Sequence, residues 1–134
     1  MYSHDTNIRV RYAETDKMGY LYYGNYAAYY EVGRVETIRS LGVNYKTMED
    51  EGIMLPVLEL KSKFLKPALY DDLLTVRTKI PHMPGIRIYF EYEIFNEQNV
   101  LLNTGSTELV FFDWKKKRPC MIPDAIAENI KRFF

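Results

Sequence analysis

The sequence predicts an α+β fold in which a single long helix lies across one face of an antiparallel sheet. Apolar and polar residues alternate with a period of two before residue 14 and through most of the chain after residue 53, as in half-buried strands. Between them runs a stripe of helical spacing, formed by Tyr26, Tyr30, Gly33, Thr37 and Leu41. Gly33 costs about 1 kcal/mol of helix propensity relative to alanine, which is understandable if the helix backbone lies close against a sheet.

The elements follow one another as strand, long helix and four long strands. The first strand is expected over residues 7–14, and the helix over residues 24–41, with Gly42 at the position of a C-terminal glycine cap. A shorter helical stretch ends at Gly52. Strands are then expected from residue 53 to 64 and over 73–80, 86–95 and 100–112, joined as a meander, with the segment 66–72 as a turn and Gly105 as a bulge. Residues 123–134 begin with Pro-Asp and predict a short terminal helix.

Length and composition limit the class of protein. The 134 residues predict one domain spanning residues 1–134, and the balance of 18 basic and 18 acidic residues argues against a nucleic-acid partner. The single cysteine, Cys120, excludes an intrachain disulfide and favours a reducing compartment. There is no apolar signal segment at the start and no run of about 20 apolar residues, so we expect a cytoplasmic protein without a membrane span. His4 and His82 have no partner at metal-ligand spacing, so no metal site is expected.

The loop between the first strand and the helix contains the residues with chemical potential. Asp16 begins the stretch DKMGYLYYGNY, in which Gly19 and Gly24 allow the backbone to bend sharply around aromatic residues. A helix that begins near Gly24 offers unpaired N–H groups, which can stabilise a carbonyl oxygen as negative charge builds on it. Asp16 could equally be a turn former or a complement to the helix dipole. An acid, free N–H groups and aromatic walls together are what acyl transfer requires.

Two stretches of the chain carry a resemblance to a known family: RVRYAETDKMGYLYYGNYAAYYEVGR and KSKFLKPALYDDLLTV. From Ile8 to about Pro123 the sequence resembles the 4-hydroxybenzoyl-CoA thioesterase-like acyl-CoA thioesterases of the hot-dog fold. The resemblance implies a five-stranded antiparallel sheet wrapped around a long central helix. It also implies a homodimer whose sheets join edge to edge, with active sites across the interface, and in many relatives a homotetramer. The substrate would be a coenzyme A thioester, hydrolysed without a metal or other cofactor.

The same resemblance assigns roles to individual residues. Asp16 takes the place of the catalytic carboxylate, as a nucleophile or as a general base that activates water. The backbone N–H of Tyr23 takes the place of the group that polarises the thioester carbonyl. Glu14 stands where the family pattern often has aspartate.

Further residues are expected to contact the substrate. Around the acyl group these are Gly19, Tyr22, Gly24 and Tyr26, although helix packing is an alternative explanation for Tyr26. Arg87, Lys115 and Lys116 are candidates for binding the CoA phosphates, although a basic run such as WKKKRP is also typical of a solvated face.

Two other functions fit part of this pattern. A non-catalytic binding module for acyl-CoA or acyl-carrier protein would use the same cleft but would not need Asp16. A hot-dog dehydratase acting on hydroxyacyl thioesters would need a histidine beside an acid, and neither His4 nor His82 lies near the helix entrance in sequence. The acyl preference, the carrier and the choice between dimer and tetramer stay open at this stage.

Overall fold

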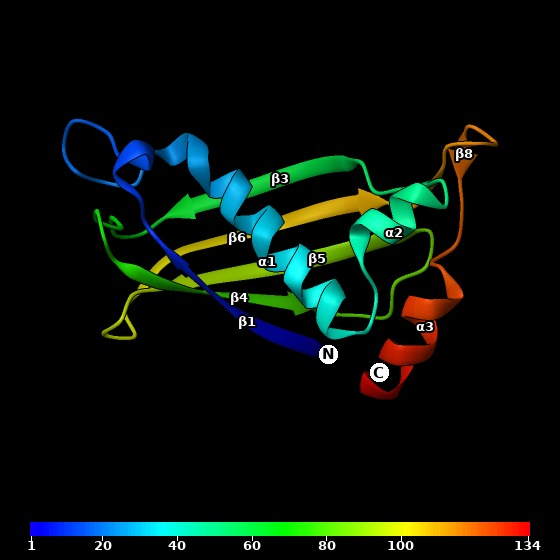
Figure 1. Ribbon diagram of the computed structural model, residues 1–134. Coiled ribbons are helices and arrows are strands. Elements are labelled where there is room, and N and C mark those ends of the chain that lie inside the picture. Colours follow the sequence, from blue (N-terminus) through cyan, green and yellow to red (C-terminus); the bar gives the residue numbers. More distant parts are fainter.

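The computed structural model describes residues 1–134 and consists mainly of one antiparallel sheet with a long helix, α1 (Tyr26–Ser40), across one face (Figure 1). Five strands form the sheet in the order β1-β4-β5-β6-β3. They are β1 (Tyr2–Arg9), β3 (Val57–Phe64), β4 (Leu73–Ile80), β5 (Arg87–Phe95) and β6 (Leu101–Val110). The hydrophobic core lies between α1 and the sheet. The helix-on-sheet architecture expected from the sequence is thus confirmed.

The long strands do not form one continuous meander. β4, β5 and β6 are consecutive neighbours, as expected, but β3 pairs with β6 and forms an edge of the sheet. The segment 65–72 is therefore a crossing connection and not a hairpin turn between β3 and β4. On its way it pairs with the loop before the helix, where the Leu21 N–H donates to the Ala68 carbonyl at 2.8 Å. The crossing is what brings the end of β3 to this loop.

The first strand lies earlier in the chain than predicted. β1 covers Tyr2–Arg9, whereas Tyr12–Glu14 forms a 3-10 turn. β1 is paired along its whole length with β4, and its last pair is Arg9 with Leu73, the first residue of β4. Beyond Arg9 no neighbouring strand is available, so the chain closes a 3-10 turn although its sequence continues to alternate.

Two glycines explain how closely α1 packs on the sheet. A Cβ atom at Gly33 would lie 2.5 Å from the Thr78 hydroxyl oxygen, so the glycine lets the helix backbone contact β4, as predicted. The bulge expected at Gly105 is absent, because the register runs evenly through that residue. A Cβ there would lie 2.2 Å from the Tyr30 hydroxyl oxygen, so Gly105 makes room for Tyr30, whose ring stacks on Tyr92.

Smaller elements gather at the far end of the sheet from the loop before the helix (Figure 1). They are α2 (Tyr45–Asp50), a small sheet of β2 (Ile53–Met54), β7 (Phe112–Asp113) and β8 (Arg118–Pro119), and α3 (Asp124–Ile130), followed by a 3-10 turn at Lys131–Phe133. The last long strand ends at Val110, two residues before the predicted boundary. No helix in the chain has the length and apolarity that crossing a membrane would require.

Candidate active site

Asp16 begins a tight loop that is closed by its own backbone. The Asp16 N–H donates to the Tyr20 carbonyl at 2.8 Å, and the Gly19 N–H donates to the Asp16 carbonyl at 3.0 Å. Gly19 has a φ of 76°, in the left-handed region that glycine adopts without strain. The crossing segment also stabilises the loop, because the Tyr70 N–H donates to the Gly19 carbonyl at 3.1 Å. The sharp bend expected at Gly19 is thus confirmed as a turn closed by hydrogen bonds.

The Asp16 carboxylate uses only one of its two oxygens within the chain. Oδ1 accepts hydrogen bonds from the N–H groups of Met18 at 2.8 Å and Tyr20 at 3.2 Å. This is the turn-forming role that the sequence allowed. Oδ2 accepts no hydrogen bond from the protein, and no lysine or arginine lies within ion-pair distance of the carboxylate. One oxygen therefore holds the side chain in place while the other is available for chemistry.

The entrance of α1 offers two open backbone donors. A 3-10 turn, Tyr23–Asn25, precedes the helix, and neither the Tyr23 nor the Gly24 N–H donates a hydrogen bond within the chain. Asn25 occupies the N-cap position of α1, yet its side chain makes no capping hydrogen bond. The first N–H groups of a helix carry its positive dipole end. They can therefore donate hydrogen bonds to a substrate oxygen on which negative charge develops.

A cavity of about 300 Å³ connects the acid and the helix entrance. Most of its wall is apolar and aromatic, and the lining residues are Asp16, Tyr20, Leu21, Tyr23, Tyr26, Phe64, Leu65, Lys66 and Pro67. The nearly fully buried ring of Tyr26 packs edge-on against Phe64 with 5.0 Å between centroids. Burial raises the pKa of the Tyr26 hydroxyl, so this wall stays uncharged. Flat rings on several sides suit a flat or slender acyl group.

Sequence reasoning did not identify the part of the wall that comes from residues 64–67. These residues end β3 and begin the crossing segment. Lys66 is the only basic side chain in the lining. The resemblance included this stretch as a strand-turn-strand motif, but nothing in its pattern indicates that it lies against Asp16. Only the placement of β3 at the sheet edge shows this.

Only one of the four residues expected around the acyl group lines the cavity. Tyr26 does so, together with Asp16 and Tyr23, whereas Gly19, Tyr22 and Gly24 do not. Tyr22 lies outside the lining, because its ring packs on Tyr23 with 4.6 Å between centroids and covers Gly24. A Cβ at Gly24 would lie 2.6 Å from that ring, so the glycine is needed for the close approach.

The expected phosphate-binding residues lie at the opposite end of the sheet from Asp16. Arg87 begins β5, paired with Val110 at the end of β6, and forms an ion pair with Glu108, which raises the Arg87 pKa. Lys115 and Lys116 lie in the turn between β7 and β8, where Lys115 packs on Gly52. A single chain therefore brings Asp16 and Tyr23 together but leaves these three basic residues apart from them (Figure 1).

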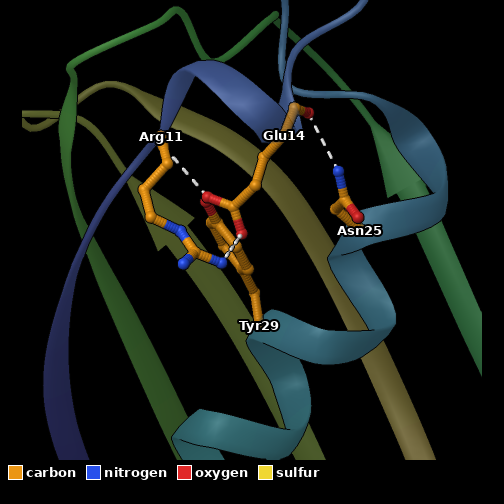
Figure 2. Close-up of polar contacts among 4 residues, drawn as sticks. All are labelled: Arg11, Glu14, Asn25 and Tyr29. Atoms are coloured by element: carbon orange, nitrogen blue, oxygen red, sulfur yellow. Dashed lines mark hydrogen bonds and ion pairs between the residues drawn. The ribbon is translucent and has the colours of Figure 1, made fainter.

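Glu14 supports the site without lining the cavity (Figure 2). Its carboxylate accepts hydrogen bonds from the Arg11 N–H at 3.0 Å and the Tyr29 hydroxyl at 2.9 Å, and forms an ion pair with the Arg11 guanidinium. Its carbonyl oxygen accepts from the Asn25 side chain and from the Tyr22 N–H, both at 2.9 Å. Burial disfavours the charged carboxylate, but the hydrogen bonds from Arg11 and Tyr29 outweigh it and lower the Glu14 pKa.

Comparisons with known proteins show which family the chain belongs to. The family model of the thioesterase-like superfamily matches residues 10–130. The acyl-CoA thioester hydrolase YbgC of Escherichia coli is 31% identical over 125 residues, which cover 93% of each chain. A chloroplastic acyl-acyl carrier protein thioesterase of Arabidopsis thaliana is 33% identical over 97% of this chain and 68% of its own length.

A solved structure extends the agreement to three dimensions. The DHNA-CoA thioesterase of Staphylococcus aureus matches with a TM-score of 0.86 and 39% identity, over 100% of this chain and 85% of that one. The helix-on-sheet fold of this chain is therefore close to that of a solved thioesterase. The chain therefore belongs to the thioesterase-like superfamily and is a thioester hydrolase with the hot-dog fold.

Proposed function

We propose that the protein hydrolyses an acyl-CoA thioester to a carboxylic acid and free coenzyme A, with Asp16 as the catalytic carboxylate. The observation that carries the proposal is the free Oδ2 of Asp16 in the wall of a cavity that Tyr23 also lines. The names of the relatives, which include an acyl-CoA thioester hydrolase and a DHNA-CoA thioesterase, support coenzyme A as the thiol. The apolar lining supports an acyl group that is itself mostly apolar.

Each part of the site has a role in the reaction. The carbonyl oxygen of the thioester accepts hydrogen bonds from the Tyr23 and Gly24 N–H groups, which stabilise the charge that develops on it. Asp16 Oδ2 then either attacks the carbonyl carbon and expels the thiolate, leaving an anhydride that water hydrolyses, or takes a proton from the water that attacks. Both routes use the same free oxygen. Both end with the same acid and thiol.

We also propose that two copies pair through β3 to form the working enzyme. β3 is an edge strand, so its outer N–H and C=O groups lack a neighbouring strand. Its apolar side chains are unusually open, with Leu58 51% and Phe64 52% exposed. Antiparallel pairing with a second copy would supply the missing strand and cover these side chains.

Such pairing has a consequence for the basic residues. In an antiparallel pair, the Phe64 end of one β3 lies beside the Val57 end of the other. Val57 is at the end of the sheet that carries the β7–β8 turn with Lys115 and Lys116. The partner's basic turn would then face the cavity end of this chain, where the CoA phosphates leave the acyl site. The dimer, and not the single chain, would complete the substrate site.

The test is the release of free thiol from a panel of aliphatic and aromatic acyl-CoAs and one acyl-carrier-protein thioester. We expect wild type to hydrolyse CoA thioesters and Asp16→Asn to lose at least about 100-fold in turnover, because a positioned carboxylate contributes this much as a base. Asparagine keeps an oxygen acceptor for the Met18 and Tyr20 N–H groups, so the variant should fold normally. Asp71→Asn, in an exposed turn where φ is 68° and asparagine is tolerated, is the matched control. Wild-type turnover in Asp16→Asn would falsify the proposal.

A further inference from the structure

Glu14 joins the two halves of the candidate site through one peptide unit. Its carbonyl oxygen holds the helix entrance by accepting from the Asn25 side chain (Figure 2). It also accepts from the Tyr22 N–H. On the other side, Glu14 precedes Thr15, which pairs with Leu21 across the base of the Asp16 loop. The acid and the open N–H groups are therefore both attached to the same short segment. A shift of Glu14 would change their separation.

The side chain of Glu14 fixes that segment in turn. Its carboxylate accepts from the Arg11 N–H, which closes the 3-10 turn, and from the Tyr29 hydroxyl, which belongs to α1. The hydroxyl is the proton donor in this contact, because burial and the negative charge of Glu14 raise the Tyr29 pKa. Tyr29 lies one helical turn after Asn25. The first turn of α1 is thus bonded to Glu14 twice, once at the main chain and once at the carboxylate.

The Asn25 side chain bonds to Glu14 and not to the first turn of α1. A residue that caps a helix with its side chain has an extended backbone. Asn25 is instead helical, with φ −87° and ψ −11°, because the 3-10 turn runs directly into α1, and its amide nitrogen donates to Glu14. The entrance is held firmly without its Tyr23 and Gly24 donors being occupied. Such an arrangement keeps open donors at the helix entrance, which suits a site that must receive an oxyanion.

We infer that Glu14, Asn25 and Tyr29 are positioning residues that hold the helix-entrance N–H groups in register with Asp16. The inference rests on the proposed thioesterase function. None of the three residues lines the cavity. Their hydrogen bonds should therefore affect the rate of the chemical step and not substrate binding. A small misplacement of a catalytic group lowers the rate strongly even when the substrate still binds.

The experiment compares single-atom and near-isosteric changes on α1. Asn25→Leu removes the donor to the Glu14 carbonyl at similar volume, and Tyr29→Phe removes only the hydroxyl that bonds the carboxylate. Tyr30→Phe is the matched control, because it removes one hydroxyl from the neighbouring buried tyrosine, whose partners Ser62 and Asn103 belong to the sheet. Steady-state kcat and KM are measured for the best acyl-CoA, together with thermal melting of each variant.

We expect kcat to fall roughly 10- to 100-fold in Asn25→Leu, and to fall less in Tyr29→Phe, with KM nearly unchanged in both. Tyr30→Phe should melt earlier but keep its kcat. Equal losses of kcat in Tyr29→Phe and Tyr30→Phe would overturn the inference, because they would indicate general loosening of the core. If Asn25→Leu does not fold, this tyrosine pair decides alone. If Asp16→Asn loses turnover but Asn25→Leu and Tyr29→Phe keep a normal kcat, only the positioning role is overturned. If Asp16→Asn keeps full turnover, the proposed function itself is overturned.

Discussion

The turn that contains Glu14 and the loop that contains Asp16 are adjacent in the chain, yet their acids are in opposite states. The Glu14 carboxylate is bonded by Arg11 and Tyr29, and its side chain is only 14% exposed. The Asp16 carboxylate accepts two backbone hydrogen bonds at one oxygen and none at the other. A fully bonded acid contributes to structure, whereas an acid with a free oxygen beside a cavity can react. The two acids are therefore distinguished by their hydrogen bonds and not by residue type.

Neutralising Glu14 should have the largest effect on stability. Glu14→Gln removes the charge that strengthens the contacts with Arg11 and Tyr29. We expect a loss of about 1–3 kcal/mol in the free energy of unfolding, the range for hydrogen bonds to charged groups. Urea unfolding measures it, and Asp16→Asn, measured in parallel, should unfold close to wild type. If Asp16→Asn were destabilised and Glu14→Gln were not, the roles assigned to the two acids would be reversed.

The contribution of the Glu14 carboxylate to stability should also depend on pH. The Glu14 pKa is lowered in the folded state, so its charged form stabilises the fold. This contribution is fully present above the pKa of glutamate in the unfolded chain, about 4.3. It is lost as the pH falls through the lower folded-state pKa.

The measurement is the difference in unfolding free energy between wild type and Glu14→Gln. We expect this difference to be constant from pH 7 to about pH 5 and to shrink below the unfolded pKa of about 4.3. A difference that grew on acidification would mean that the Glu14 carboxylate is destabilised by its surroundings, contrary to the bonding pattern.

Local sequence was sufficient for the elements whose residues all lie close together. The stripe from Tyr26 to Leu41 is buried as predicted, and β4 has the predicted bounds, because helix and strand periods are properties of short segments. The first strand was displaced, because its end depends on where its partner β4 begins. The predicted meander was wrong at β3, because no local pattern specifies which strand an edge strand joins.

Some residues of the candidate site could likewise be predicted from local sequence, and others could not. Asp16 and Tyr23 lie within eight positions of each other, and a loop that turns back on itself brings both to one cavity, as the sequence suggested. Phe64 and Lys66 reach that cavity only through the crossing segment, so their contribution depended on the topology. Arg87 and Lys115 were chosen by charge, which carries no information about the end of the sheet at which a residue lies.

The smallest effects are expected from the cations next to the two acids. Arg11 pairs with Glu14 but its side chain is 77% exposed, so Arg11→Met should lower the free energy of unfolding only slightly. Lys66 has no ion-pair partner although it shares the cavity wall with Asp16. Lys66→Met should therefore leave unfolding unchanged.

Because the Lys66 ammonium is free, its expected partner is the substrate. In Lys66→Met we predict a KM several-fold higher for acyl groups that carry an anionic or hydroxyl oxygen, and little change for plain aliphatic ones, since only the former lose a charge-assisted hydrogen bond. Steady-state kinetics on matched pairs, such as benzoyl-CoA with its hydroxylated analogue, measures the difference. Lys63→Met on the preceding strand, outside the cavity lining, is the control. An equal rise of KM for every substrate would instead indicate contact with the coenzyme A moiety, which all of them share.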